Sequence, residues 1–286
     1  MISSLGQNAT VPVYSCKDVV GKQQLTIDAL HAMMEQDITH SCRDYLNDGD
    51  CILSEDEVLT SDDHVSERSQ KLTVKDRAQI VDWCYSLIDL CQLARSNVAM
   101  AMSIADRFMS NPNGLLVSQF TPYSFSPQEI RHNRTMFQLL AVSALYTTIK
   151  INEQVIFSAE NFAAATKGVY TAEEIEAMER TMLECLAWKV SAPTALEVGC
   201  TMLELMTPQV QDVIDLTGII EDLAFQTECA VRDYHLVTTE RTSTIAIMAL
   251  LNAIKYNEHM SKAAQQCFLN ALSNVLDECK TRLWRK

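Results

Sequence analysis

The chain has 286 residues, of which 48% are hydrophobic and 21% are charged, and its 23 basic and 37 acidic residues give a net charge of −14. This length is enough to bury one large core or two ordinary ones. With only seven glycines and six prolines, the composition disfavours all-β and glycine-rich phosphate-binding folds and favours uninterrupted helices. The negative charge argues against nucleic acid or an anionic membrane as a partner, because both attract a cationic face.

The acidic residues are concentrated between residues 35 and 67. This stretch contains eleven acidic residues and a single basic residue, Arg43, so its net charge is −10 and that of the rest of the chain is −4. We interpret the stretch as a solvated connector, with two alternatives: steering towards a basic partner surface, or a signal for turnover. The pattern Arg43-x-x-Leu46 resembles a degradation signal, although such short patterns often arise by chance.

The ten cysteines show no C-x-x-C motif and no paired spacing. We interpret them as small core residues in a reducing compartment, the nucleus or the cytoplasm, because the spacing does not support the alternative of a zinc site. The N-terminus has no basic region followed by an apolar stretch, so it is not a signal peptide, and no apolar run approaches the length of a transmembrane helix.

Apolar periodicity and capping residues predict an all-α protein with a lead helix and two consecutive helical domains. We expect a mobile tail over residues 1–23, a lead helix and acidic connector over 24–71, with the helix ending near Leu46, and domains over 72–192 and 193–286. Predicted helices in the first domain begin at Thr73, Ser96, Ser126, Ser158 and Thr171. The Ser126 helix is expected to continue to Asn152 and the Thr171 helix to Trp188. Beyond Pro193, helices are predicted over about 194–206, 208–231, 238–256 and 261–284.

Motifs of enzymes and metal sites are nearly absent. Glu129-Ile-Arg-His132 is a single Glu-x-x-His, whereas a di-iron bundle needs two, so we interpret it as a solvated helical turn. The stretch from Asp44 to Glu55 approximates a calcium-binding loop, but Leu46 replaces an oxygen ligand and a plain acidic loop is favoured. We therefore predict no enzymatic activity, no metal and no cofactor.

Four segments in order resemble the cyclin box: Arg77-Ala-Gln-Ile-Val-Asp-Trp83, Ser103–Ser110, Phe137–Glu153, and Tyr170–Glu179 followed by Cys185-Leu-Ala-Trp188 and Ala192-Pro193-Thr194. The chain is therefore identified as similar to the cyclin family over about residues 72–200. A weaker resemblance over Glu228–Ile254 extends it into the second half. The resemblance implies two tandem cyclin folds, the second shorter or degenerate, with the lead helix packed on the first.

Five residues typical of the box are present. The resemblance implies that Arg77 and Asp106 pair with each other, that Leu139 lies in the core, and that Lys150 and Glu179 hold a kinase chain just before its αC helix. The alternative for Lys150 and Glu179 is a surface salt bridge that contributes little. The implied function is a regulatory subunit that binds and activates a cyclin-dependent kinase in cell-cycle control.

Many cell-cycle cyclins also carry an apolar groove for substrates or inhibitors with a short basic–apolar motif. Ile80, Trp83 and Gln138 match its positions, but Asp76 stands where an apolar residue is usual and Gln79 is polar. An acid there would favour a basic peptide, yet the groove itself is in question. The alternative function is a two-cyclin-fold transcription-factor-like protein or adaptor without kinase activation, against which the net negative charge counts when DNA binding is considered.

Overall fold

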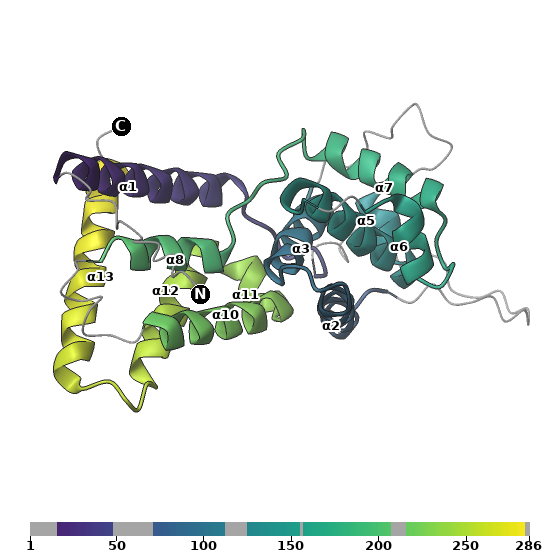
Figure 1. Ribbon diagram of the computed structural model, residues 1–286. Coiled ribbons are helices and arrows are strands. Elements are labelled where there is room, and N and C mark those ends of the chain that lie inside the picture. The colour runs from purple at the N-terminus through teal and green to yellow at the C-terminus, as the bar shows by residue number, and fades with distance from the viewer. Residues whose placement is uncertain (1–15, 48–70, 112–124, 155–156, 207–215, 284–286) are drawn as a thin grey trace, which may run out of the picture.

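Helices are the regular secondary structure throughout the part of the chain that the structure describes. The computed structural model describes residues 16–47, 71–111, 125–154, 157–206 and 216–283, and Figure 1 shows two groups of helices side by side. The lead helix α1 covers Cys16–Thr39. The first group consists of α2 (Val74–Cys91), α3 (Ser96–Met109), α4 (Pro127–Arg131), α5 (Arg134–Asn152), α6 (Ala159–Ala165) and α7 (Ala172–Cys185). The second consists of α8 (Ala195–Glu204), α10 (Leu216–Arg232), α11 (Tyr234–Thr239), α12 (Thr242–Lys255) and α13 (Lys262–Leu283).

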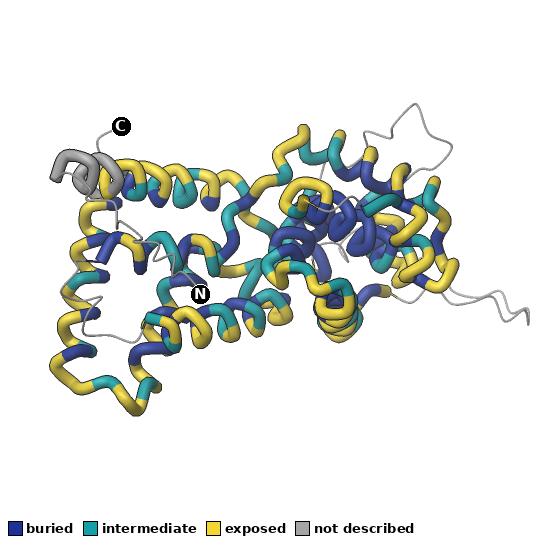
Figure 2. The backbone as a smooth tube through the Cα atoms, viewed as in Figure 1, coloured by how far each residue is buried: buried dark blue, intermediate teal, exposed yellow. Residues whose placement is uncertain are grey.

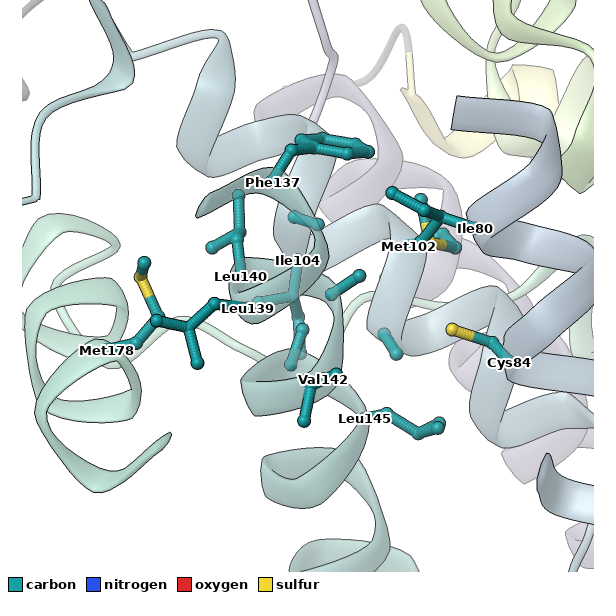
Figure 3. Close-up of a cluster of buried hydrophobic side chains, with 14 of the residues drawn as sticks. Ile80, Cys84, Met102, Ile104, Phe137, Leu139, Leu140, Val142, Leu145 and Met178 are labelled. Atoms are coloured by element: carbon teal, nitrogen blue, oxygen red, sulfur yellow. The ribbon is translucent and has the colours of Figure 1, made fainter. Parts of the chain in front are cut away.

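Helix α5 is the centre of the first group. Its residues from Leu139 to Ile149 are all buried, as expected for a helix that neighbours surround on every side. It packs against α3, α7 and α2. Figure 3 shows side chains of α5, among them Leu139 and Leu145, between Met178 of α7 and Cys84 of α2. Leu139 therefore lies in the core, as the resemblance implies.

The lead helix differs from its prediction in both position and partner. It covers Cys16–Thr39 instead of 24–46, so residues 16–23 are helical and not part of a tail. Its apolar residues Ile27 and Leu30 belong to the core of the second group, with Val198, Leu250 and Phe268. The prediction that this helix packs on the first domain is therefore wrong, because its apolar face lies over α8, α12 and α13.

Residues 40–47 cross from the lead helix to the first group. Tyr45 and Leu46 are buried in the first core although they do not lie in a helix. The spacing of apolar residues that predicted a helix as far as Leu46 therefore comes from buried residues of a non-helical segment. The calcium-loop pattern lies partly outside the described residues, and the described Asp44 accepts a hydrogen bond from the Tyr234 hydroxyl at 2.8 Å. In the Arg43-x-x-Leu46 pattern, Leu46 is buried in the folded chain.

Four helix starts carry a complete capping box. The hydroxyls of Thr73, Ser126, Thr171 and Thr194 each accept a hydrogen bond from the backbone N–H of an acid three residues later, and the carboxylate of that acid accepts one from the backbone N–H of the capping residue. Each box satisfies two N–H groups that lack a helical partner. The starts at Thr73, Ser126 and Thr171 are among those predicted, so local sequence determines where these helices begin.

Two predicted helix ends in the first domain are wrong. The Ser126 helix stops at Arg131, and a new helix starts after Asn133, whose side chain accepts the Met136 N–H. An asparagine that caps in this way offers the backbone an alternative to continuing the helix. Helix α7 ends at Cys185 and not at Trp188, because Ala187 and Trp188 have φ values of 49° and 62°, which are left-handed.

A buried ion pair joins the two groups of helices. The Arg77 guanidinium binds both carboxylate oxygens of Asp106, with Nε–Oδ1 at 2.9 Å and Nη2–Oδ2 at 2.6 Å. Its Nη1 donates to the carbonyl of Val231 in α10 at 2.8 Å. The Tyr45 hydroxyl donates to Asp106 Oδ1 at 2.8 Å, so four separate segments meet at this pair.

The lead helix provides the missing cap of α12. The residue before α12, Arg241, makes no side-chain cap. Instead Asp37 of α1 accepts hydrogen bonds from the N–H groups of Thr242 and Ser243, both at 2.9 Å, and from the Ser243 hydroxyl at 2.7 Å. A carboxylate at this helix end also interacts favourably with the helix dipole.

A cavity of about 240 Å³ lies at the same junction, between the end of α1, α3, α10 and the start of α12. His40 and Cys42 are among its lining residues. Burial raises the pKa of Cys42 to about 12, so its thiol stays protonated at neutral pH. Burial, reinforced by the positive charges of Arg107 and Lys189, lowers the pKa of His40.

Replacing one member of the buried pair should destabilise the whole molecule. We expect Arg77→Ala to lower the free energy of unfolding by about 3–5 kcal/mol, because it leaves the Asp106 carboxylate buried without its cation. Urea unfolding followed by circular dichroism measures this. The double variant Arg77→Met/Asp106→Leu should lose less than the single one, and equal losses would contradict the role of the pair.

The depressed pKa of His40 predicts a pH dependence of stability. The folded state favours the neutral imidazole, so this contribution is present above the unfolded value of about 6.5 and is lost as the pH falls below it. Unfolding at pH 7.5 and pH 5.5 should therefore show a smaller stability difference for His40→Gln than for the wild type. An identical difference in both proteins would exclude His40 as a source.

Candidate functional site

Lys150 and Glu179 form a surface ion pair between two helices of the first group. Lys150 Nζ lies 3.0 Å from Glu179 Oε1 and 2.9 Å from Oε2. The Lys150 side chain is 43% exposed and that of Glu179 is 11% exposed. The ammonium group therefore faces solvent while the carboxylate is largely enclosed by its own helices.

Two residues that the sequence reasoning missed hold this pair in place. The Thr147 hydroxyl donates to Glu179 Oε1 at 2.9 Å, and the Tyr146 ring lies beneath Lys150, with 4.5 Å from Nζ to the ring centroid. They precede Lys150 by three and four residues, the spacing that brings side chains together on one helix face. That spacing is the signal from which they could have been found.

The electrostatics favour a charged Lys150. Partial burial alone would lower its pKa, but the hydrogen bond and negative charge of Glu179 outweigh this effect, and the pKa is raised. Lys150 also lies in the last turn of α5, where a cation interacts favourably with the helix dipole. The site therefore presents a stable cation above a carboxylate whose position is fixed.

Helices α5 and α7 run in the same direction, so their C-terminal ends lie on the same side. The Ser143 hydroxyl donates to the carbonyl of Ile175, and four residues later on both helices the Thr147 hydroxyl donates to Glu179. Both contacts join residues 32 apart, as two helices with the same direction require. Ile151 directly follows Lys150 and is 47% exposed, and Trp188, in the turn after α7, is 69% exposed. Aromatic side chains are enriched in protein-binding surfaces, which makes the exposed ends of these two helices candidates for such a surface.

The structure does not bring the predicted groove residues to an open apolar surface. Ile80 is buried, Trp83 is half-buried against the first core, and Gln138 accepts a hydrogen bond from the Tyr170 hydroxyl at 3.2 Å. Figure 3 shows Ile80 pointing towards the core residues of neighbouring helices.

The unusual acid at the groove position is already neutralised. Asp76 Oδ1 lies 3.1 Å from Arg134 Nη1, while Oδ2 accepts the backbone N–H of Thr73 in the capping box. Arg134 also donates to Gln79, so it bridges the two polar residues that depart from the family pattern. Arg134 therefore spans the surface where an apolar groove was predicted.

Metal-binding clusters, cysteines and membrane-spanning helices were compared with expectation in the described part of the chain. No three His, Cys, Asp or Glu side chains among these residues gather closely enough to hold a metal ion. Glu129 serves as the capping acid of α4. The eight cysteines whose side chains are described are all free thiols. Within the same residues, no helix combines the length and the apolar character that crossing a bilayer requires.

Comparison with known proteins gives a consistent result. Residues 50–191 match the family described as cyclin, N-terminal domain. The chain is 25% identical to the G1/S-specific cyclin-E1 of Mus musculus over 143 residues, which are 50% of this chain and 31% of the relative. It is 24% identical to cyclin-A3-2 of Oryza sativa subsp. japonica over 220 residues, which are 75% of this chain and 51% of the relative. The matches thus span from about a third to half of these relatives.

A solved structure shares the fold. The X-ray structure of a viral cyclin from herpesvirus saimiri superposes with a TM-score of 0.53 at 17% identity, covering 74% of this chain and 82% of the viral one. The two groups of helices are thus tandem cyclin folds. The burial pattern in Figure 2 agrees with two cores, one in each group.

The neutralised groove predicts weak docking of basic–apolar peptides. We expect a synthetic peptide with an arginine two residues before a leucine to bind the wild-type chain with a Kd weaker than about 1 mM, which corresponds to about −4 kcal/mol. Fluorescence anisotropy of the labelled peptide measures this. The control is Arg134→Ala, which frees the Asp76 charge and should bind the peptide more tightly than the wild type. Micromolar binding by the wild type would contradict the assignment.

Proposed function

Since the chain belongs to the cyclin family, we propose that it is a regulatory subunit that binds and activates a cyclin-dependent serine/threonine protein kinase. The observation that carries this proposal is the Lys150–Glu179 pair, whose lysine is 43% exposed and whose carboxylate is largely enclosed, held in place by Tyr146 and Thr147. The similarity to G1/S-specific cyclins supports a role in the cell cycle. The complex would form in a reducing compartment, the nucleus or the cytoplasm.

The pair suits the backbone of an extended segment. An ammonium group donates to carbonyl oxygens, and a carboxylate accepts backbone N–H groups, so adjacent opposite charges satisfy both kinds of peptide group. Glu179 is fixed by Thr147, which reduces the entropy lost on binding. A kinase segment that precedes the αC helix fits this chemistry.

Activation requires only differential binding. A kinase whose αC helix moves between an outward and an inward position is active when that helix completes the Lys–Glu pair that positions ATP. A subunit that binds the inward arrangement more tightly shifts the population towards it. The chain then contributes no catalytic group, and all the chemistry remains with the kinase.

The ion pair alone would not supply enough differential binding energy to activate a kinase. Moving an equilibrium from 1:99 to 99:1 needs about 5.5 kcal/mol of differential binding, whereas an exposed ion pair contributes about 0–1 kcal/mol. Covering the exposed parts of Ile151 and Trp188 would add on the order of 3 kcal/mol. Apolar contact therefore supplies most of the binding energy, and the charged pair determines register and orientation.

Exchanging the two charges separates binding from stability. In Lys150→Glu/Glu179→Lys an ion pair can still form, but the enclosed position 179 then holds an ammonium group in place of the carboxylate that accepts from Thr147, so urea unfolding of the variant is measured alongside binding to establish that it folds. The cation and the carboxylate then occupy each other's places, and affinity for the kinase should fall at least about tenfold, or 1.4 kcal/mol. A panel of purified cyclin-dependent kinases provides the readouts, which are co-elution and phosphorylation of a Ser-Pro peptide.

A matched control is the exposed pair of Arg232 and Asp82, with Nη2–Oδ2 at 2.7 Å. The exchange Arg232→Asp/Asp82→Arg should leave kinase binding unchanged. Wild-type affinity and activation in the Lys150/Glu179 exchange would show that this pair is not the contact. If the wild-type chain neither binds nor activates any kinase of the panel, the proposed function itself is wrong.

A further inference from the structure

The cavity between the two cyclin domains is large enough for a small molecule. Its volume is about 240 Å³, whereas an apolar cavity of about 150 Å³ already binds benzene. Both domains line it, since Ala99 and Ser103 belong to α3 of the first domain and Thr227 belongs to α10 of the second. Ligand sites occur preferentially at domain interfaces, so this cavity is a candidate site.

The buried charges in the lining already have partners within the protein. Arg77 and Asp106 bind each other, and Asp37 accepts hydrogen bonds from the start of α12. Glu240 and Arg241 also line the cavity, but they are exposed, adjacent in the sequence and of opposite sign. An ionised ligand would therefore lose its hydration without finding a buried counter-charge among these residues, which is costly.

Two titratable residues of the segment after α1 are uncharged as well. Burial raises the pKa of Cys42 to about 12 and is the largest cause of the lowered pKa of His40. Near neutral pH the thiol is therefore protonated and the imidazole is neutral. The lining thus favours an uncharged ligand.

The threonine hydroxyls of the lining are suited to a ligand that donates hydrogen bonds. Thr227 donates its hydroxyl proton to the carbonyl of Ala224 at 2.9 Å. Thr238 and Thr239 donate theirs to carbonyls in the preceding turn of α11, at 2.8 and 2.7 Å. Since a hydroxyl group has one proton, these three oxygens can only accept a further hydrogen bond.

Apolar side chains form the rest of the wall. They come from four different elements and include Ala99, Met102, Ala195, Val237 and Ile245. An apolar ring that leaves water to pack against them gains free energy roughly in proportion to the area buried. A ring that carries an N–H or O–H group can use both the apolar wall and the hydroxyl oxygens.

We propose that this cavity binds an uncharged ring compound that carries N–H or O–H donors, as indoles and phenols do. Because both domains line the cavity, such a ligand contacts the two at once and stabilises their folded arrangement. The lining includes neither Lys150 nor Glu179, so the inference does not depend on the proposed function.

Indole is the probe for this site, and N-methylindole, which lacks the N–H group, is its control. In a saturation-transfer NMR titration of the full chain, we expect indole to bind with a Kd on the order of 0.1–1 mM. N-methylindole should bind about 3- to 10-fold more weakly, because it donates no hydrogen bond to the threonine oxygens. Indole should also raise the melting temperature, since it binds the folded chain.

Two variants that fill the cavity locate the site. Ser103→Phe on α3 and Ala195→Phe at the start of α8 should each weaken indole binding at least about tenfold, because the new ring takes the space of the ligand. The matched control is Ser86→Phe, at an exposed position of α2, which should bind indole as the wild type does. Urea unfolding establishes that each variant folds.

A methionine in the wall gives a measurement that needs no substitution. In the wild-type chain with isotope-labelled methionine methyl groups, indole should shift the methyl resonance of Met102, which lines the cavity. The resonance of Met248, which is exposed on α12, should stay in place.

Three results would overturn the inference. The first is that indole neither binds the wild type nor shifts the Met102 resonance, which would leave the cavity to water. The second is that a folded filling variant binds indole with wild-type affinity, which would place the compound elsewhere on the chain. The third is equal affinity for indole and N-methylindole, which would contradict the selection of hydrogen-bond donors.

Discussion

The buried pair of Arg77 and Asp106 is the interaction on which the arrangement of the two domains depends. Two charges removed from water are costly unless every donor and acceptor finds a partner. Here the guanidinium binds Asp106 and the carbonyl of Val231, while the carboxylate also accepts the Tyr45 hydroxyl. The requirement for complete pairing therefore forces α2, α3, α10 and the segment after the lead helix to meet in one geometry.

That geometry has consequences at the surface. Fixing α10 against α2 brings Glu228 to Arg95, and the end of α5 is joined to the same turn through Glu153 and Ala94. Lys150, at the end of α5, is thus in a constant position relative to residues of the second domain. A continuous series of contacts thus links the buried polar junction to the Lys150–Glu179 pair, and under the proposed function such preorganisation would limit the entropy lost on binding.

Local sequence was sufficient for the helical class and for the helix starts at Thr73, Ser126 and Thr171, since these depend on near neighbours and on periodicity, whereas the core position of Leu139 was implied by the resemblance. It was insufficient for the lead helix, whose periodicity continues through Leu46 although burial there comes from the first core. The resemblance brought Lys150 and Glu179 together, and the structure adds Tyr146 and Thr147. The Arg95–Glu228 contact joins residues 133 positions apart, a separation that no local pattern reveals.

The cap that Asp37 provides to α12 also bears on how the chain is made. Asp37 and Thr242, which form this contact, are 205 residues apart in the sequence. Ile27 and Leu30 of the same helix belong to a core whose other residues lie as far along the chain as Phe268. At ribosomal speeds of 5–20 residues per second, about 10–40 s pass between the synthesis of the lead helix and that of its binding site. During that interval the apolar side chains of this helix lack the second-domain core that covers them in the folded chain, and such exposed apolar surface is prone to aggregation.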